Sequence, residues 1–359
     1  MTVELSSLRR LQSIFPRSCS KLRVGKMSIK SANVFRTLVF VVSLAFAVSG
    51  TSLAVELTGS VVSTEWLHLH KNDVIILDFR ADTDGFVSEP VFEVVDGKKS
   101  LVEGGGHIEG ARLVDFNTWR VSRQISGKKI DKLVPDAAAV QEMMQALGVN
   151  ESDALVLTTP GETYDEVDMA ARAYWTLKSY GHRAMAVLDG GNAAWGRDGY
   201  PLVNSVYTVP VRGDWRADPF DQRWFIDTDG LSNLLESGGS SKIIDARPAP
   251  QYLGIVFKSP AVTAPGHIRT AKNFPPDLQV RPRGLAQVFL TDKQYRDIFQ
   301  ATGLATDSSE FVTYCNTGHL AAGAWFVMSE IMGLRDVRLY DGSMHEWTTL
   351  GRPVVAEVK

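Results

Sequence analysis

The residue of this chain best placed to do chemistry is Cys315. It follows the apolar run 311–314 (FVTY) and precedes residues 316–319 (NTGH), after which a helical pattern begins at Leu320. A thiol at the end of a buried strand, in a tight loop that leads into a helix, has its anion stabilised by loop N–H groups and by the helix dipole. The pattern therefore favours a nucleophilic cysteine over the small buried apolar residue that most free cysteines are.

The elements that must position Cys315 occur twice. Residues 74–80 (VIILDFR) and 242–247 (KIIDAR) are each a short apolar strand that ends in Asp-x-Arg, and residues 106–111 (GHIEGA) match 266–271 (GHIRTA). Three further matches follow in the same order: residues 155–159 with the strand before Cys315, 170–180 with 320–332, and 187–191 plus Trp195 with 339–343 plus Trp347. Five matches in one order indicate a duplicated unit.

Each copy alternates short apolar strands with helical patterns, which is typical of an α/β fold. We predict two tandem domains, each a mainly parallel sheet flanked by helices, at residues 55–208 and 227–359, with a linker at 209–226. Such sheets bind ligands at the carboxyl ends of their strands, which is where Cys315 falls. In the first copy Thr159 takes the place of Cys315 and an acidic loop follows, so we expect that domain to be non-catalytic.

Residues 1–54 have the pattern of a secretory signal peptide. Eight basic residues and one acidic residue precede an uncharged apolar run at 37–48, and Ser52-Leu53-Ala54 offers small residues for cleavage. Met27 is an alternative start, an uncleaved anchor is an alternative interpretation, and a transit peptide is a weaker one. We expect a periplasmic or secreted protein, with no stable membrane association once the leader is cleaved after Ala54.

Cleavage after Ala54 would also remove Cys19 and leave Cys315 without an intramolecular partner. The chain has 38 basic and 41 acidic residues, and removing the leader's 8 and 1 leaves a net charge of −10. That charge argues against nucleic acid as a partner, and an anionic substrate would need a local basic pocket. The histidines lack metal-ligand spacing and no GxGxxG motif precedes a helix, so we expect no metal and no cofactor. We also expect a monomer.

The repeated motifs, from about residue 57 to 355, resemble the tandem rhodanese family, the thiosulfate and 3-mercaptopyruvate sulfurtransferases. The resemblance implies that the chain is a sulfurtransferase. The Cys315 thiolate would take the outer sulfur of a small anionic donor as a persulfide, and a thiophilic acceptor, cyanide or a thiol, would remove it. It also implies that Arg247 binds the donor anion and that loop backbone N–H groups surround the terminal sulfur. The loop residues concerned are Asn316, Thr317, Gly318, His319 and Leu320.

The residue after the cysteine leaves the donor open, because Asn316 is neither the basic residue typical of thiosulfate-type members nor the small one typical of mercaptopyruvate-type members. His319 could be a cation that lowers the pKa of the thiol, or a helix-start residue that faces solvent. A second hypothesis is an exported sulfane-sulfur carrier with little turnover. A third is a phosphatase or arsenate reductase, which needs an arginine six residues after the cysteine, where this chain has Ala321.

The remaining motif residues fit structural roles. We expect Asp78 and Arg80 to form a strand-end ion pair, and the histidines of the two Gly-His-Ile motifs to make structural hydrogen bonds. Trp195 and Trp347 fit a core position. Arg281 and Arg283 could help to form an anion-attracting rim.

Overall fold

The computed structural model describes residues 55–358, with gaps at 96, 210, 239–241, 305 and 307–309. The predicted leader, with Met27, Cys19 and Ala54, lies outside the described residues. In the part of the chain that is described, no helix has both the length and the apolar character needed to cross a membrane.

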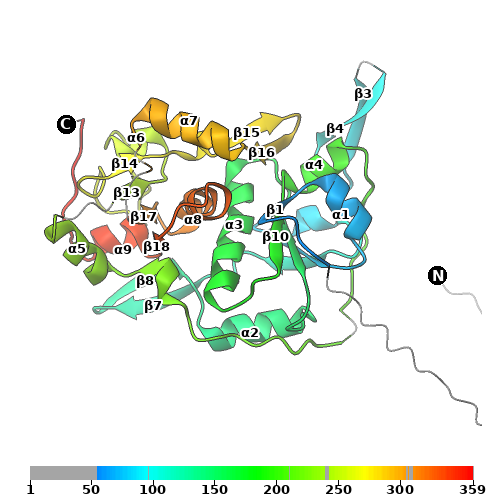
Figure 1. Cartoon of the computed structure of the whole chain (residues 1–359), viewed down its shortest axis with the longest axis horizontal. Helices are drawn as coiled ribbons and strands as arrows, with labels where there is room; N and C mark the ends of the chain where they lie inside the picture. The colour runs from blue at the N-terminus through cyan, green and yellow to red at the C-terminus, as the bar shows by residue number, and fades with distance from the viewer. Residues whose placement is uncertain are drawn as a thin grey trace, which may run out of the picture. The chain divides into compact units, whose positions relative to one another are not determined.

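The first half is built on a five-stranded parallel sheet (Figure 1). In spatial order its strands are β1 (Val61–Val62), β10 (Met185–Leu188), β9 (Leu155–Thr158), β2 (Ile75–Arg80) and β6 (Arg112–Asp115). Its helices are α1 (Thr64–His70), α2 (Ala137–Ala146), α3 (Tyr164–Ser179) and α4 (Gly191–Arg197). Strands β9 and β10 are buried along their whole length, as apolar runs in a parallel sheet covered by helices should be.

The second half repeats this strand order. Its parallel sheet runs β12 (Phe225–Ile226), β18 (Val337–Tyr340), β17 (Phe311–Tyr314), β13 (Lys242–Asp245) and β14 (Lys272–Asn273). Its helices are α5 (Thr228–Glu236), α6 (Ala249–Tyr252), α7 (Asp292–Thr302), α8 (His319–Phe326), which continues as the π-helical η4 (Val327–Ile331), and α9 (Ser343–Thr349). The α/β architecture of two tandem parallel sheets is as predicted.

Antiparallel pairs and short 3₁₀ helices complete the described part of the fold. The pairs are β3 (Val91–Val95) with β4 (Lys98–Glu103), β5 (His107–Ile108) with β11 (Leu202–Val203), β7 (Val121–Ile125) with β8 (Lys128–Leu133), and β15 (Val280–Arg283) with β16 (Ala286–Phe289). The 3₁₀ helices are η1 (Asp84–Phe86), η2 (Gln222–Trp224) and η3 (Pro276–Leu278).

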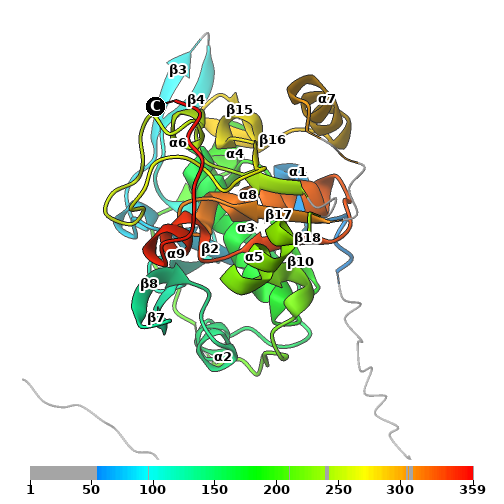
Figure 2. The same cartoon turned by 90° about the vertical axis from the view of Figure 1, so that its left-hand side faces the viewer.

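Two hairpins cross from one half to the other. Strand β8 of the first half lies beside α9 of the second in both side views, and the N–H of Val134 donates to Asp341 Oδ2 at 2.8 Å (Figure 1, Figure 2). In return, β16 of the second half lies beside α4, and the N–H of Phe289 donates to Asp189 Oδ1 at 2.9 Å. Each half therefore covers strand ends of the other.

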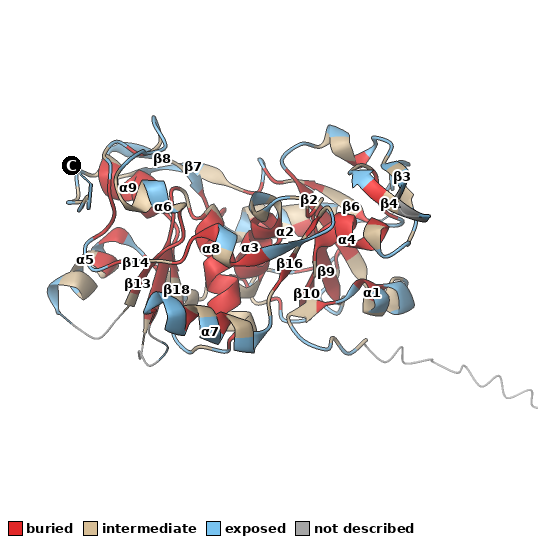
Figure 3. Ribbon diagram, turned by 90° about the horizontal axis from the view of Figure 1, so that it is seen from above, coloured by how far each residue is buried: buried red, intermediate tan, exposed pale blue. Residues whose placement is uncertain are grey.

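The core between the halves is formed by α3 and α8, which lie side by side at the centre of the molecule and are mostly buried (Figure 3). Tyr174 of α3 packs edge-on against Phe326 of α8, with ring centroids 4.9 Å apart. Its hydroxyl donates to Glu330 Oε2 at 3.0 Å. Apolar packing on this scale makes the two halves one structural body.

The segment predicted as a linker is ordered against the first half. Trp215 is 2% exposed, and its ring N–H donates to His182 Nδ1 at 3.0 Å. Strand β12 of the second sheet already begins at Phe225, inside the predicted linker. Buried aromatic residues thus hold this segment in place, although its sequence lacks the periodicity of a helix or strand.

Candidate active site

The loop that carries Cys315 is tied at both ends to the start of α9. Cys315 follows β17 directly and is 1% exposed. Ser343 Oγ accepts from the N–H of Cys315 at 3.0 Å and from the N–H of Gly318 at 3.1 Å, and it donates to the carbonyl of Tyr340 at 2.9 Å. Ser343 holds a left-handed backbone with φ of 52°, a strained conformation for serine that surrounding structure must support.

This arrangement leaves most loop N–H groups free for a ligand. Among the described residues, the N–H groups of Asn316, Thr317, His319 and Leu320 have no hydrogen-bond acceptor. The N–H of Gly318 donates to Ser343 Oγ, and the prediction that it serves the terminal sulfur stays a prediction. Gly318, with φ of 74°, begins α8, and a Cβ there would lie 2.7 Å from the carbonyl oxygen of Asp341.

The side chain of Asn316 points toward the protein interior. Its side chain is 5% exposed, and Nδ2 donates to Gln251 Oε1 at 2.8 Å. Its Oδ1 is buried and has no partner among the described residues. A buried carbonyl oxygen without a donor is costly, so Asn316 gives the loop one unmet acceptor next to the thiol.

Arg247 lies just past the end of β13 and is fully buried. Its Nε and Nη2 donate to Asp245, at 2.9 and 2.6 Å, and Nη2 also donates to the carbonyl of Gly266 at 2.8 Å. Burial opposes the charge, but Asp245 outweighs it and raises the pKa of Arg247, and Cys315 adds to that effect. Asp245 and the carbonyl of Gly266 thus occupy two of the three guanidinium nitrogens of Arg247, and its predicted binding of a donor anion stays a prediction. Only Nη1 is left unpaired.

His319 is held neutral. Its Nε2–H donates to the carbonyl of Asp165 at 2.8 Å, and its ring packs 5.0 Å from that of Phe116. Burial, with the charge of Arg120 second, lowers the pKa of His319 to about 3, although one edge of the ring stays open to the pocket. The lowered pKa and the nearby charge of Arg120 argue against His319 as a cation beside the thiol.

A pocket of about 420 Å³ lies over the loop, and Thr317 and His319 form part of its wall. Three cations line it, Arg120 and Lys132 from the first half and Lys258 from the second, together with one acid, Asp131, which pairs with Lys129. In the described part of the chain none of the three is paired with a carboxylate. Burial, then the charge of Arg120, lowers the pKa of Lys132; Asp131 opposes this shift, and Lys258 adds to it.

Arg120 is the deepest of these cations. It lies 4.3 Å over the ring of Phe116, and its Nε is buried without a partner. Burial, with Arg172 second, lowers the pKa of Arg120 to about 10, whereas Cys315 and Asp341 raise it, so Arg120 stays charged at neutral pH. These cations form a local basic pocket of the kind that an anionic substrate would need. No motif marks its cations, because three separate segments supply them.

Arg172 of α3 is a second arginine that the sequence did not reveal. It is fully buried, its Nη2 donates to Asp341 Oδ1 at 2.5 Å, and its Nη1 donates to the carbonyl of Gly318 at 3.1 Å. The half without a thiol thus holds the loop of the half that has one. Arg281 and Arg283, by contrast, lie on β15 and do not line the pocket over Cys315.

The structural roles predicted for the other motif residues are confirmed. Arg80 and Asp78 form a buried ion pair at 2.9 Å. His107 Nδ1 is 2.8 Å from the carbonyl of Phe86, as His267 Nδ1 is from that of Tyr252. Trp195 and Trp347 lie in the core, and each is 2% exposed. Among the described residues, no group of three histidine, cysteine or acidic side chains could hold a metal ion.

The chain is similar to known proteins along most of its length. The model of the rhodanese-like domain matches residues 227–350. A Mycobacterium tuberculosis protein provisionally named a thiosulfate sulfurtransferase is 29% identical over 291 residues, which is 79% of this chain and 97% of that protein. TtuD of Thermus thermophilus, named a sulfur carrier protein, is 27% identical over 307 residues, 82% of this chain and 95% of TtuD.

The fold matches as well. The crystal structure of SseA from Escherichia coli, described as a 3-mercaptopyruvate sulfotransferase with the rhodanese fold, has a TM-score of 0.61 and 25% identity. The match covers 80% of this chain and 99% of SseA, so it includes both halves. Residues 227–350 thus match the rhodanese-like domain, and the chain as a whole, with its cysteine loop at the end of β17 and its two repeated sheets, is similar in sequence and in fold to tandem-domain sulfurtransferases.

Proposed function

We propose that this protein moves a sulfane sulfur from a small anionic donor, thiosulfate or 3-mercaptopyruvate, to a thiophilic acceptor through a persulfide on Cys315. The observation that carries this proposal is the set of three unpaired cations, Arg120, Lys132 and Lys258, over the cysteine loop of an otherwise acidic chain. Unpaired cations in a partly closed pocket attract and orient an anion.

The reaction has two steps. The Cys315 thiolate attacks the outer sulfur of the donor, so that a new S–S bond forms and the old bond to that sulfur breaks. Sulfite leaves with the electron pair from thiosulfate, and pyruvate enolate leaves from 3-mercaptopyruvate and takes up a proton. Cyanide or a thiolate then attacks the terminal sulfur, and Cys315 departs as the thiolate.

The residues around the thiol have separate roles in this scheme. The free N–H groups of Asn316, Thr317, His319 and Leu320 replace water around the anionic terminal sulfur. The three pocket cations hold the donor's sulfonate or carboxylate, while buried Arg247 acts on the thiolate through its charge. Ser343 and Arg172 keep the loop in shape. No step requires a cofactor.

Intact-protein mass spectrometry tests the proposal. After incubation with thiosulfate, and separately with 3-mercaptopyruvate, we expect the protein to gain one sulfur atom and to lose it again to cyanide. Cys315→Ser should show no gain while keeping its circular dichroism spectrum. Sulfur uptake in that variant, or none in the parent with either donor, would reject small-donor transfer through Cys315.

One observation favours a second candidate, an exported sulfane-sulfur carrier that serves a protein partner. Next to the pocket residue Lys258 stand three consecutive exposed apolar residues, Ile255, Val256 and Phe257, which are 57%, 50% and 40% exposed. An apolar run at the rim of a basic pocket suits an acidic protein acceptor. Discharge of a preformed persulfide distinguishes the two candidates, because a carrier would lose sulfur slowly to cyanide and fast to its protein partner.

We further propose that the protein works as a monomer in the periplasm or outside the cell. The basic, apolar and small-residue order of residues 1–54 supports export. N-terminal sequencing of the protein recovered from its producing cells tests this. A chain that begins at Val55 is expected, whereas an intact leader in the cytoplasmic fraction would contradict export.

A further inference from the structure

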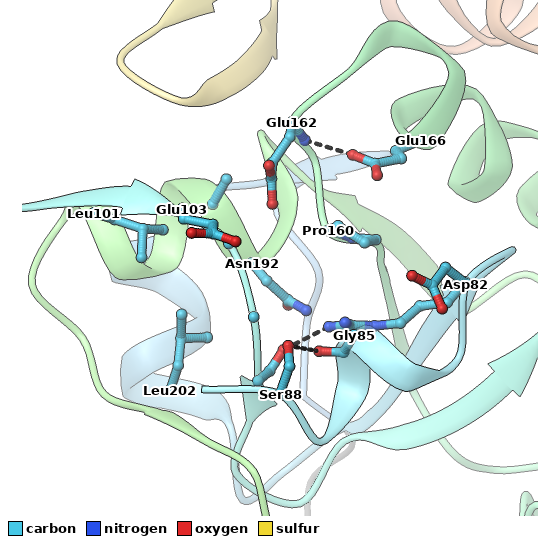
Figure 4. Close-up of a pocket in the computed structure, with 15 residues that line it drawn as sticks. Asp82, Gly85, Ser88, Leu101, Glu103, Pro160, Glu162, Glu166, Asn192 and Leu202 are labelled. Carbon is cyan, nitrogen blue, oxygen red and sulfur yellow. Dashed lines mark hydrogen bonds between the residues drawn. The ribbon is translucent and has the colours of Figure 1, made fainter. Parts of the chain in front are cut away.

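A second pocket, of about 270 Å³, lies over the strand ends of the first half (Figure 4). Its wall includes Pro160 and Glu162, in the loop after β9 that corresponds by the repeat to the Cys315 loop after β17. The pocket is smaller than the roughly 300–1,000 Å³ of sites for drug-sized ligands. It holds no thiol, yet it retains charged side chains that the sulfur chemistry does not use.

The floor of this pocket presents one open nitrogen of a buried arginine. Arg80 is 2% exposed, and its Nε and Nη2 are taken by Asp78 and by the carbonyl of Gly106. Its Nη1 has no hydrogen-bond partner among the described residues. In the second half the matching nitrogen of Arg247 is sealed from solvent. Residue 85 is a glycine, and a Cβ on it would lie 3.2 Å from Arg80 Nη1. Without that Cβ, this side of Arg80 Nη1 stays uncovered.

The opposite wall is acidic. Glu162 and Glu103 extend their carboxylates toward the same part of the pocket (Figure 4), and the carboxylate of Glu162 accepts no hydrogen bond among the described residues. Burial, then the charge of Glu166, raises the pKa of Glu162, whereas Arg80 lowers it. Anionic and cationic groups therefore face one small space.

The remaining wall is apolar and close-fitting. Leu101 and Leu202 lie together on one side of the pocket, away from Asp82 (Figure 4). Glu162 can fold over the chain only because residue 104 is glycine: a Cβ on Gly104 would lie 1.6 Å from Glu162 Oε1. The pocket therefore combines one basic nitrogen, a short apolar wall and four acids. Two of these acids, Asp82 and Glu166, already accept backbone hydrogen bonds, which leaves Glu103 and Glu162 for a ligand.

We propose that this first-half pocket binds a small amino acid, with its carboxylate on Arg80 Nη1, its ammonium between Glu103 and Glu162, and any short side chain against Leu101 and Leu202. A zwitterion satisfies both walls at once, because a carboxylate accepts from the arginine and an ammonium donates to the acids. The site is separate from Cys315 and does not depend on sulfur transfer.

Isothermal titration calorimetry of the purified chain tests the proposal, with glycine, β-alanine, 4-aminobutyrate and leucine as probes. Ethylamine, acetate and Ca²⁺ serve as probes of the single charges. We expect at least one amino acid to bind and the single-charge probes to bind far more weakly, and Cys315→Ser to bind as the parent does. Absence of any amino acid binding tighter than about 1 mM, or equal binding of ethylamine or Ca²⁺, overturns the proposal.

Two variants locate the ligand. Glu162→Gln removes the charge without removing any hydrogen bond, and we expect binding to weaken about tenfold, since a charge-assisted contact is lost. Gly85→Ala places a methyl group against Arg80 Nη1 and should abolish binding while the Arg80–Asp78 pair remains. Glu93→Gln, an exposed acid on β3 outside the pocket, is the matched control. Unchanged affinity in Glu162→Gln overturns the assignment even if Gly85→Ala fails to fold.

Discussion

Replacing Arg172 by methionine tests how the first half supports the active loop. Arg172 is fully buried, and its bonds to Asp341 at 2.5 Å and to the carbonyl of Gly318 at 3.1 Å both cross between the halves. Methionine keeps most of the side-chain volume but leaves Asp341, which is 2% exposed, with only the N–H of Val134 as partner. Removing one member of a buried ion pair costs about 3–5 kcal/mol, because the other charge stays uncompensated.

Sulfur transfer should fall as well. The carbonyl of Gly318 loses a hydrogen bond from a charged donor, which is worth about 1.5–3 kcal/mol, and part of that loss appears as loop disorder in the transition state. At about 1.4 kcal/mol for each factor of ten, we expect kcat to drop by about ten- to a hundredfold, with a smaller change in KM. A purely structural role elsewhere in the fold would lower stability without this selective effect on kcat.

The assay is urea unfolding followed by tryptophan fluorescence and circular dichroism, together with thiosulfate turnover. Lys293→Met is the matched control: Lys293 pairs with Asp297 one helical turn away on α7, its side chain is 83% exposed, and its loss should cost no more than about 0.5 kcal/mol. The double variant Arg172→Met/Asp341→Asn removes both charges and should recover much of the lost stability. Our reasoning is refuted if Arg172→Met costs no more than Lys293→Met, or if the double variant is the less stable.

Two further predictions concern the pocket over the loop that follows Cys315. Lys258→Ala should raise KM for thiosulfate about tenfold with little change in kcat, because one of the unpaired cations is lost, while Lys128→Ala, exposed and outside the pocket, should leave KM unchanged in steady-state assays. The pKa of His319 is lowered to about 3 in the folded protein, so as the pH falls the imidazole is protonated in the unfolded chain before it is protonated in the folded one. The contribution of His319 to stability is therefore present above about pH 6.5 and is lost as the pH falls toward 3. Unfolding midpoints at pH 5 and pH 7.5 should therefore differ less in His319→Gln than in the parent, and a steeper pH dependence in the variant would contradict the neutral imidazole.

The half without a thiol has a direct part in the site. It supplies Arg120 and Lys132 to the pocket, it holds the loop through Arg172, and its hairpin β7–β8 lies against α9. That this half is non-catalytic stays a prediction, made from Thr159 at the position of Cys315. Even so, the first half is needed to assemble the positive charge that a donor anion would meet.

The sequence by itself determined the features that depend on neighbouring residues. Helix ends are one such feature: α7 has Thr291 as its N-cap and Gly303, with φ of 69°, as its C-cap, and both residue types are typical of those positions. The five repeated matches predicted two α/β sheets, and Cys315 falls at the end of a strand as expected. These properties are local because hydrogen bonding and capping act over a few residues.

Only the tertiary structure decided where the charges act. Arg120, Lys132 and Lys258 become one pocket although more than a hundred residues separate the first two from the third, since electrostatic forces follow distance in space. Burial decided the rest. It commits two nitrogens of Arg247 to Asp245, lowers the pKa of His319, and turns Asn316 toward Gln251. No local pattern reports how deeply a side chain is desolvated, and desolvation determines which charged groups remain free for a ligand.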